Sequence, residues 1–170
     1  MTNEDKNVKM RKRLRDNAVY LISGGIIIVC CIGLLIAGKI LHPTAVIGSS
    51  MSPTYKDGQL VQTEPYTGQE LHISDVVVVN TDDGKTLIKR IVGLPGDTIL
   101  ISEGILIRNG VPQKEGYPPM ENAGMASDPL VVPEGKIFVL GDNRNHSSDS
   151  REYGCLSTSH VISIVRKIIF

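Results

Sequence analysis

Two adjacent serines, Ser49 and Ser50, occupy the stretch IGSSMSPTY at residues 47–55. A serine hydroxyl is a poor nucleophile until a positioned base accepts its proton. These serines can therefore carry out covalent chemistry only if the fold brings a base to one of them, and the rest of the chain has to supply that base.

Two kinds of base are available in the sequence. His146 lies close to Asp142 and Asp149, and a histidine backed by an aspartate is the familiar partner of a catalytic serine. A lysine is the other option, but its ordinary pKa is about 10.4, so an apolar environment must make its amine neutral. Lys89 is the best such candidate because it interrupts an apolar, strand-like stretch at residues 86–94. It could equally lie on a solvated strand edge, so the residues alone leave both bases open.

The elements that must position these residues are expected to be strands. Residues 75–80 are a β-branched run that predicts a hairpin with residues 86–94 across the turn TDDGK. Residues 98–110 alternate on either side of a Glu-Gly turn and predict a second hairpin. Residues 136–143 indicate a strand ending in a turn, whereas five prolines predict that residues 111–134 form a long irregular connection.

An uncharged run at the N-terminal end predicts a membrane anchor. Residues 18–38 carry no charge, and as a helix they would reach about 31 Å, which matches the hydrocarbon core of a bilayer. A cleaved signal peptide has a shorter apolar region, and a buried soluble helix is the other alternative. Six basic residues within residues 1–17, against Lys39 alone after the run, predict a cytoplasmic tail. The expected fold is mainly β: an antiparallel β-sheet, barrel-like catalytic domain at residues 43–170 on a single N-terminal transmembrane helix.

Composition narrows the classes of function. The chain has 170 residues, is 41% hydrophobic and has a formal net charge of zero, which allows one modest domain plus an accessory element. Beyond residues 1–17 the basic residues are dispersed and the aromatics few, so no nucleic-acid surface is expected. Cys155 has no partner in the exported part, and the four histidines fall at no metal-ligand spacing. No disulfide, metal or other cofactor is therefore expected.

Three stretches, in this order after the apolar run, resemble the type I signal peptidases, the membrane-bound serine proteases of bacteria that remove signal peptides from exported proteins. They are GSSMSPT at residues 48–54, IKRIVGLPGD at residues 88–97 and GDNRNHSSDSREYG at residues 141–154. The resemblance implies a Ser–Lys dyad in a β-rich fold. The short distance between the second and third stretches is similar to the compact Gram-positive form of the family.

The resemblance also implies roles for single residues. It implies that Ser50 is the nucleophile, Lys89 the general base, and Ser147 the residue that hydrogen-bonds the lysine amine and orients it. Three apolar residues are expected to line the substrate pocket: Val46, Met51 and Ile88. Five residues of the third stretch are expected to support the site, the last two as an ion pair: Asp142, Asn143, Arg144, Asp149 and Arg151.

The chain departs from the family pattern near its nucleophile. Some relatives carry a serine two residues before it, whose hydroxyl helps to bind the oxyanion, but this chain has Gly48 there. The oxyanion hole is then expected to use the backbone N–H of Ser50, with a water or the Ser49 side chain as the open choice for a second donor. Asn145 and His146 replace the Asp-Asn that is common in the third stretch. Both members of the dyad are nevertheless present.

The resemblance further implies substrates and location. The substrates are expected to be preproteins with small-x-small cleavage sites, docked as an added strand beside the Lys89 segment. The expected location is the bacterial cell membrane, with the catalytic domain outside the cytoplasm, in contact with the lipid bilayer and acting as a monomer. Two rival hypotheses are a protease of the self-cleaving repressor type, which predicts a DNA-binding head, and a catalytically silent relative, which predicts loss of the serine or the lysine.

Overall fold

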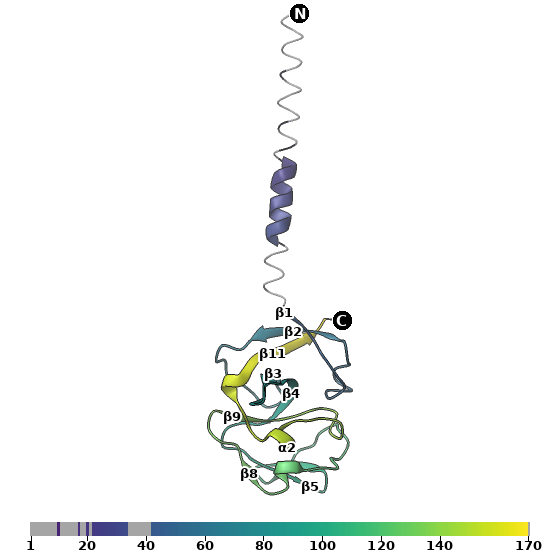
Figure 1. Cartoon of the computed structure of the whole chain (residues 1–170), viewed down its shortest axis with the longest axis vertical. Coiled ribbons are helices and arrows are strands. Elements are labelled where there is room, and N and C mark those ends of the chain that lie inside the picture. Colours follow the sequence, from purple (N-terminus) through teal and green to yellow (C-terminus); the bar gives the residue numbers. More distant parts are fainter. Residues whose placement is uncertain (1–9, 11–16, 18–19, 21, 34–41, 170) are drawn as a thin grey trace, which may run out of the picture. The chain divides into compact units, whose positions relative to one another are not determined.

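The computed structural model shows a chain in two units (Figure 1). The units are Met1–His42 and Pro43–Phe170. The structure describes these residues: 10, 17, 20, 22–33 and 42–169. The second unit is therefore described almost completely, and it contains all three of the stretches to which chemistry is assigned.

The first unit contributes a helix at residues 22–33. No helix among the described residues is both long enough and apolar enough to cross a membrane. The tail predicted at residues 1–17 lies almost wholly outside the described residues, and the span predicted at residues 18–38 lies partly outside them. Both therefore stay predictions.

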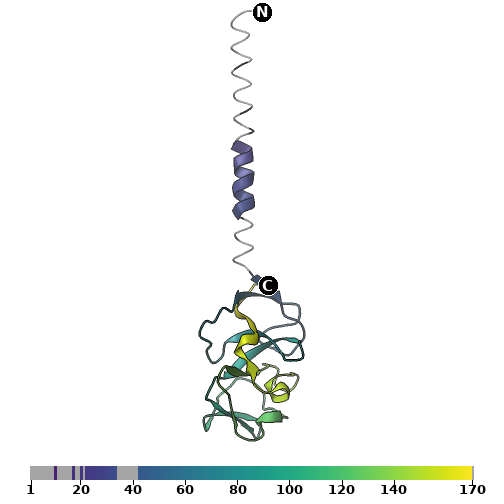
Figure 2. The same cartoon turned by 60° about the vertical axis from the view of Figure 1, so that its left-hand side comes forward.

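Antiparallel strands dominate the second unit (Figures 1 and 2), which confirms the mainly β fold class. The larger sheet contains, in spatial order, β1 (His42–Ala45), β2 (Leu60–Pro65), β11 (Val161–Ile168), β3 (Val76–Asn80), β4 (Thr86–Gly93), β9 (Lys136–Leu140) and β10 (Leu156–Ser157). The smaller sheet contains β7 (Val111–Pro112), β6 (Ile105–Arg108), β5 (Thr98–Ser102) and β8 (Leu130–Val131). The helical turns are η1 (Gly124–Ala126), α2 (Ser150–Tyr153) and η2 (Thr158–His160). In the described residues the larger sheet ends at β1 and β10, so the fold consists of two sheets and not of one closed barrel.

Both predicted hairpins are present. β3 pairs with β4, which places Val77 opposite Lys89. β5 pairs with β6 around Glu103 and Gly104, which have positive φ angles of 52° and 76°. Glycine adopts such angles without steric cost, which is why a Glu-Gly pair is a turn signal. The connection at residues 111–134 is irregular as predicted, apart from β7, η1 and β8.

The sequence analysis did not identify β11, which lies at the centre of the larger sheet. It pairs with β2 on one side, where Ser163 faces Pro65, and with β3 on the other, where Ile164 faces Val77. Residues 161–168 are rich in β-branched side chains, which favour strands. No turn signal connects them to a neighbouring strand, however, so their place in the sheet could not be predicted from local pattern.

The strand β3 is buried on both faces. Val77 and Val79 pack into one apolar cluster, while Val76 and Val78 pack on the opposite face in a second cluster that contains Met51. Side chains alternate between the two faces of a strand, and a strand covered on both faces needs a continuous apolar run. This explains why four consecutive valines form a central strand here.

The strand β9 links the two sheets. Ile137 and Val139 pack with the core of the larger sheet, whereas Phe138 and Leu140 pack against Ile99 of β5 in the smaller sheet. β9 ends immediately before the third stretch at residues 141–154. The start of that stretch is therefore fixed by a strand that is buried on both faces.

Candidate active site

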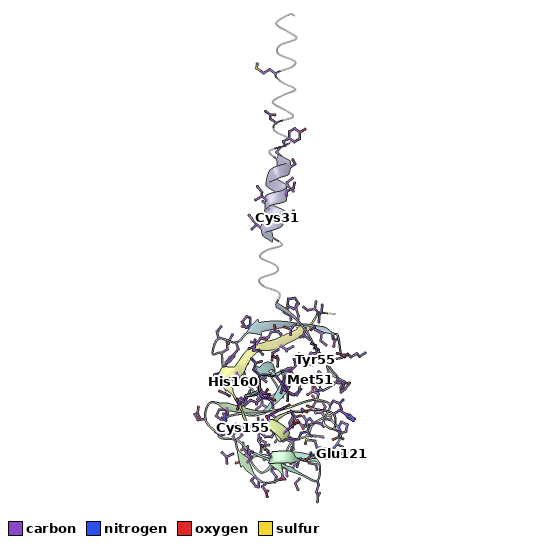
Figure 3. The ribbon with its side chains drawn as sticks, viewed as in Figure 1. Cys31, Met51, Tyr55, Glu121, Cys155 and His160 are labelled. Carbon is purple, nitrogen blue, oxygen red and sulfur yellow. The ribbon has the colours of Figure 1, made fainter. Side chains whose placement is uncertain are left out.

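Ser50 is half-buried in a turn between β1 and β2, directly before the fully buried Met51. Its carbonyl accepts a hydrogen bond from the Asn143 backbone N–H at 2.9 Å, and the Ser49 carbonyl accepts one from the Asn143 side chain at 3.1 Å. The Tyr55 N–H donates to the Met51 carbonyl at 2.9 Å, and both side chains belong to one apolar cluster (Figure 3). The serine turn is thus bound to the third stretch on one side and to the core on the other.

Lys89 lies on β4 with 3% of its surface exposed. Its Nζ donates to Ser50 Oγ at 2.8 Å and to the Ile88 carbonyl at 3.0 Å. Burial lowers the pKa of Lys89, and the negative charges of Asp149 and Asp142 oppose this lowering only in part. A lower pKa increases the neutral fraction of the amine. At this distance a neutral amine can accept the proton of the Ser50 hydroxyl.

The rival Ser–His–Asp triad is not assembled. His146 is exposed, and within residues 42–169 its side chain makes no hydrogen bond to Ser50 or to an aspartate. The two candidate aspartates, Asp142 and Asp149, each form an ion pair with an arginine instead. The described residues therefore bring a lysine, and not a histidine, to the serine.

Asp142 is completely buried and binds Arg90, the residue after Lys89 on β4. Arg90 donates to both carboxylate oxygens, from Nε at 2.8 Å and from Nη2 at 2.6 Å. Burial by itself raises the pKa of Asp142, but the hydrogen bonds from Arg90 and Thr54 outweigh it and leave that pKa below its ordinary value. The pair connects β4 to the third stretch. The sequence analysis expected Asp142 to support the site but did not identify Arg90 as its partner.

Asp149 and Arg151 are joined as the expected ion pair, with Nε to Oδ1 and Nη2 to Oδ2 both at 2.9 Å. Asp149 is fully buried, and its Oδ1 also accepts the backbone N–H of Arg151 at the start of α2. Its Oδ2 accepts the backbone N–H of Gly141 at 2.9 Å. The carboxylate therefore fixes the beginning and the end of the turn that contains Ser147.

Ser147 is placed beside the dyad but does not contact the amine. Its Oγ is buried and has no hydrogen-bond partner among the described residues. A Cβ atom added to Gly141 would lie 2.1 Å from Ser147 Oγ and 2.6 Å from the Ser50 carbonyl oxygen, so Gly141 is wedged between these two residues. The expected hydrogen bond from Ser147 to Lys89 is absent here, and its orienting role stays a prediction.

The expected pocket residues form an apolar wall. Val46 and Met51 have exposed fractions of 2% and 0%, and they pack with the half-buried Ile88 and with Val76 and Val78 of β3. Val46 and Met51 are therefore covered in this structure. Their contact with substrate therefore stays a prediction.

Arg144 contacts two residues that the sequence analysis missed. It is 2% exposed and forms an ion pair with Glu115, and its Cζ lies 4.4 Å from the centre of the Tyr117 ring. Glu115 and Tyr117 belong to the irregular connection at residues 111–134, which has no periodicity to indicate where its side chains point.

A polar cavity of about 410 Å³ opens beside Ser147 and Arg144. Asn145, Glu152 and Glu121, which Figure 3 labels, are among the other residues that line it. In the part of the chain that the structure describes, histidine, cysteine and acidic side chains do not gather in threes at a site suited to a metal ion.

Comparisons with known proteins identify a family of similar chains. A family model described as "Signal peptidase, peptidase S26" matches residues 20–170. The chain is 37% identical over 151 residues to signal peptidase I of Bacillus licheniformis, covering 81% of this chain and 80% of the relative. It is 32% identical over 183 residues to signal peptidase I T of Bacillus subtilis (strain 168), covering 98% and 94%. The crystal structure of a signal peptidase I from Enterococcus faecalis V583 aligns with a TM-score of 0.46 and 29% identity, over 60% of this chain and 98% of that chain.

Proposed function

Because the chain belongs to the signal peptidase (peptidase S26) family and is a serine endopeptidase, we propose that it cleaves signal peptides with Ser50 as nucleophile and Lys89 as general base. The observation that supports these roles is the 2.8 Å separation between Lys89 Nζ and Ser50 Oγ. The amine is buried and its pKa is lowered, so the protein favours the neutral base that a serine nucleophile needs.

The proposed reaction runs through an acyl-enzyme. Neutral Lys89 accepts the Ser50 proton while Oγ attacks the scissile carbonyl carbon, and the resulting ammonium protonates the leaving amine as the peptide bond breaks. A water then attacks the ester, again with Lys89 as base, and Ser50 recovers its proton when the signal peptide leaves. Lys89 is therefore neutral at the start and at the end of each cycle.

The backbone N–H of Ser50 is the proposed donor to the oxyanion. It has no hydrogen-bond partner among the described residues, so it is available to a substrate. The backbone N–H of Gly48 is not available, because it donates to Asp57 Oδ1 at 2.8 Å. The second donor must come from another group, and the Ser49 hydroxyl remains the proposed side-chain choice.

The proposed substrate is an extended preprotein segment with small residues at its −1 and −3 positions. β4 pairs with β3 from Thr86 to Arg90, but its pairing with β9 begins only at Arg90. The edge of β4 before Arg90, which includes Lys89, is thus free of a strand partner in the described residues, and an extended peptide can add there. Alternate side chains of such a peptide would face the apolar wall formed by Val46, Met51 and Ile88.

Residues 18–38 are the proposed membrane anchor. The uncharged run and the basic flank support an orientation with residues 1–17 in the cytoplasm and residues 43–170 outside it. This places the catalytic domain, acting as a monomer, beside the bilayer where preproteins emerge.

The test is cleavage of a purified preprotein with an Ala-x-Ala site by the full chain in lipid vesicles. One cut after the second alanine is expected, and replacing that alanine by a large residue should prevent it. Cleavage that persists in the Ser50→Ala variant, or no cleavage by the folded wild type, would contradict the proposal.

A further inference from the structure

An ion pair with a buried guanidinium is one of several contacts that join the irregular connection at residues 111–134 to the third stretch. Arg144 donates to both oxygens of the Glu115 carboxylate, with Nη2 2.8 Å from Oε1. The guanidinium is 2% exposed, whereas the Glu115 side chain is 21% exposed. A guanidinium this deeply buried needs a carboxylate partner, because an unpaired buried charge is strongly destabilising.

Arg144 has a second contact that leads to the dyad. Its Nε donates to the carbonyl oxygen of Gly141 at 3.0 Å. On the other side of the same residue, the Gly141 N–H donates to Asp149 Oδ2 at 2.9 Å, and Asp149 is paired with Arg151. Gly141 is therefore bound at both its peptide groups by buried ion pairs, one from within the third stretch and one that depends on Glu115.

The position of Gly141 shows which atoms of the site would move if these hydrogen bonds were lost. The space where a side chain would lie is already filled by Ser147 Oγ and by the Ser50 carbonyl oxygen. The next residue but one, Asn143, donates its N–H to that same Ser50 carbonyl at 2.9 Å. A shift of Gly141 is therefore transmitted to the nucleophile and to the hydroxyl beside it.

We propose that Glu115 is a positioning residue for the catalytic dyad, which acts through Arg144 on Gly141 and thereby fixes Ser50 relative to Lys89. The inference rests on the roles proposed above for Ser50 and Lys89. Tyr117, whose ring lies 4.4 Å from the Arg144 guanidinium carbon, supports the same arrangement from the same connection.

The chemistry depends steeply on this placement. A displacement of about 1 Å at a reacting group can lower a rate by about a hundredfold, and smaller shifts have smaller effects. Glu115 lies on none of the elements that would contact the substrate in the proposed docking. Its loss should therefore lower kcat and leave KM nearly unchanged.

The experiment compares Glu115→Gln, Glu115→Asp and wild type in preprotein cleavage at 25 °C, with kcat and KM determined separately. Glu115→Gln keeps the shape but loses the charge, and we expect kcat to fall about tenfold with less than about a twofold change in KM. Glu115→Asp keeps the negative charge on a side chain that is one methylene group shorter, and its kcat should lie closer to wild type than to Glu115→Gln. Glu64→Gln is the matched control, because it breaks the exposed Arg166–Glu64 pair (Nε to Oε2, 2.6 Å) and should retain wild-type kcat.

Stability is controlled with a variant of the apolar core. Leu156→Ala removes a buried side chain on β10 and should lower the melting temperature without lowering kcat at 25 °C. If Glu115→Gln does not fold, Arg144→Lys keeps a positive charge beside Glu115 but removes the Nε donor to the Gly141 carbonyl, and it should lower kcat with KM nearly unchanged.

The outcomes separate this inference from the proposed function. Wild-type kcat in a folded Glu115→Gln, a Glu115→Asp as impaired as Glu115→Gln, or an equal loss of kcat in Leu156→Ala would each overturn the positioning role. Lys89→Ala is measured in parallel. An active Lys89→Ala would overturn the dyad itself, whereas an inactive Lys89→Ala beside a fully active Glu115→Gln would overturn the role of Glu115 alone.

Discussion

Lys89 and Ser50 approach each other from two regions of different construction. Lys89 lies on β4 of a regular hairpin, where it pairs with Val77 of β3 and is 3% exposed. Ser50 lies in a turn, and its position depends on hydrogen bonds to Asn143, which follows Ser50 by more than ninety positions. One side of the site is thus fixed by burial of nearby residues, and the other by polar contacts between distant ones.

The two kinds of contact should also respond differently to substitutions. Apolar burial tolerates small changes of shape, because its free energy scales roughly with the area removed from water. Buried ion pairs tolerate little, because removal of one partner leaves an unpaired charge. The polar side of the site should therefore be the more sensitive one, and the five predictions below test that difference.

The largest expected effect is the loss of either member of the proposed dyad. Ser50→Ala and Lys89→Ala should each reduce kcat/KM on a preprotein by at least about a thousandfold, because the two groups act as a unit. The double variant should be little worse than either single one. Ser49→Ala and His146→Ala should keep most of the activity. A folded but inactive His146→Ala would show that the base has been misassigned.

Arg90→Met breaks a pair on the polar side. It leaves the fully buried Asp142 without its cation, and the free energy of unfolding at pH 7 should fall by about 3–5 kcal/mol. Glu64→Gln, which breaks the exposed pair with Arg166, should cost less than about 1 kcal/mol. Urea denaturation of both variants provides the measurement.

At acid pH the difference in the free energy of unfolding between Arg90→Met and wild type should become smaller. In wild type the pKa of Asp142 is lowered, so the stability that it contributes is present above its ordinary pKa of about 3.9 and is lost as the pH falls through the lowered value. In Arg90→Met burial raises that pKa, and protonation relieves the unpaired charge as the pH falls. A gap that is constant from pH 7 to pH 4 would contradict this account of the pair.

The pH dependence of cleavage tests the apolar side. In the proposed mechanism the neutral form of Lys89 is the active one, and burial lowers its pKa, so kcat/KM should rise about tenfold per pH unit and level off below pH 10.4. His146→Gln should leave the rising part of this pH profile, its acid limb, at the same pH. A limb that moves with the His146 substitution and a titration close to pH 10.4 in wild type are the two results that would reject a buried lysine base.

Ser147→Ala has the smallest expected effect and separates stability from activity. Its Oγ is buried and has no hydrogen-bond partner in the part of the chain that the structure describes, so the free energy of unfolding should not fall when the hydroxyl is removed. If the hydroxyl orients the free amine during reaction, kcat/KM should fall by about 2- to 12-fold, the equivalent of one hydrogen bond worth 0.5–1.5 kcal/mol. Wild-type kcat/KM in this variant would remove Ser147 from the mechanism.

The same division explains how much could be predicted from the sequence. The hairpin that contains Lys89 was predicted because alternation and turn residues are local signals. The pair between Asp142 and Arg90 joins positions 52 apart, and that between Arg144 and Glu115 joins positions 29 apart. Neither pair leaves a local pattern, so the resemblance to a family indicated one partner of each and missed the other.

The strand β11 was missed for a related reason. Its β-branched residues are a local signal, but a strand paired with β2 and β3 is placed by contacts across the whole unit. Ser147 shows a different limit, because here the resemblance predicted a contact that the described residues do not make. The resemblance predicted a hydrogen bond to the lysine amine, but that hydroxyl has no partner among the described residues, and the Lys89 amine donates to Ser50 and to the Ile88 carbonyl instead.

The central place of β11 has a consequence for when the protein becomes active. Residues of β2 and β11 that contact each other, such as Glu64 and Arg166, are 102 positions apart, and β11 is the strand that connects β2 to the β3–β4 hairpin. During synthesis the chain emerges in order, so β2 and the hairpin are exposed well before β11 arrives between them. Contacts of such long range form late in folding. A partly synthesised chain is therefore expected to carry its serine and its lysine without joining them, and we expect the proposed dyad to form only once residues 161–168 have emerged.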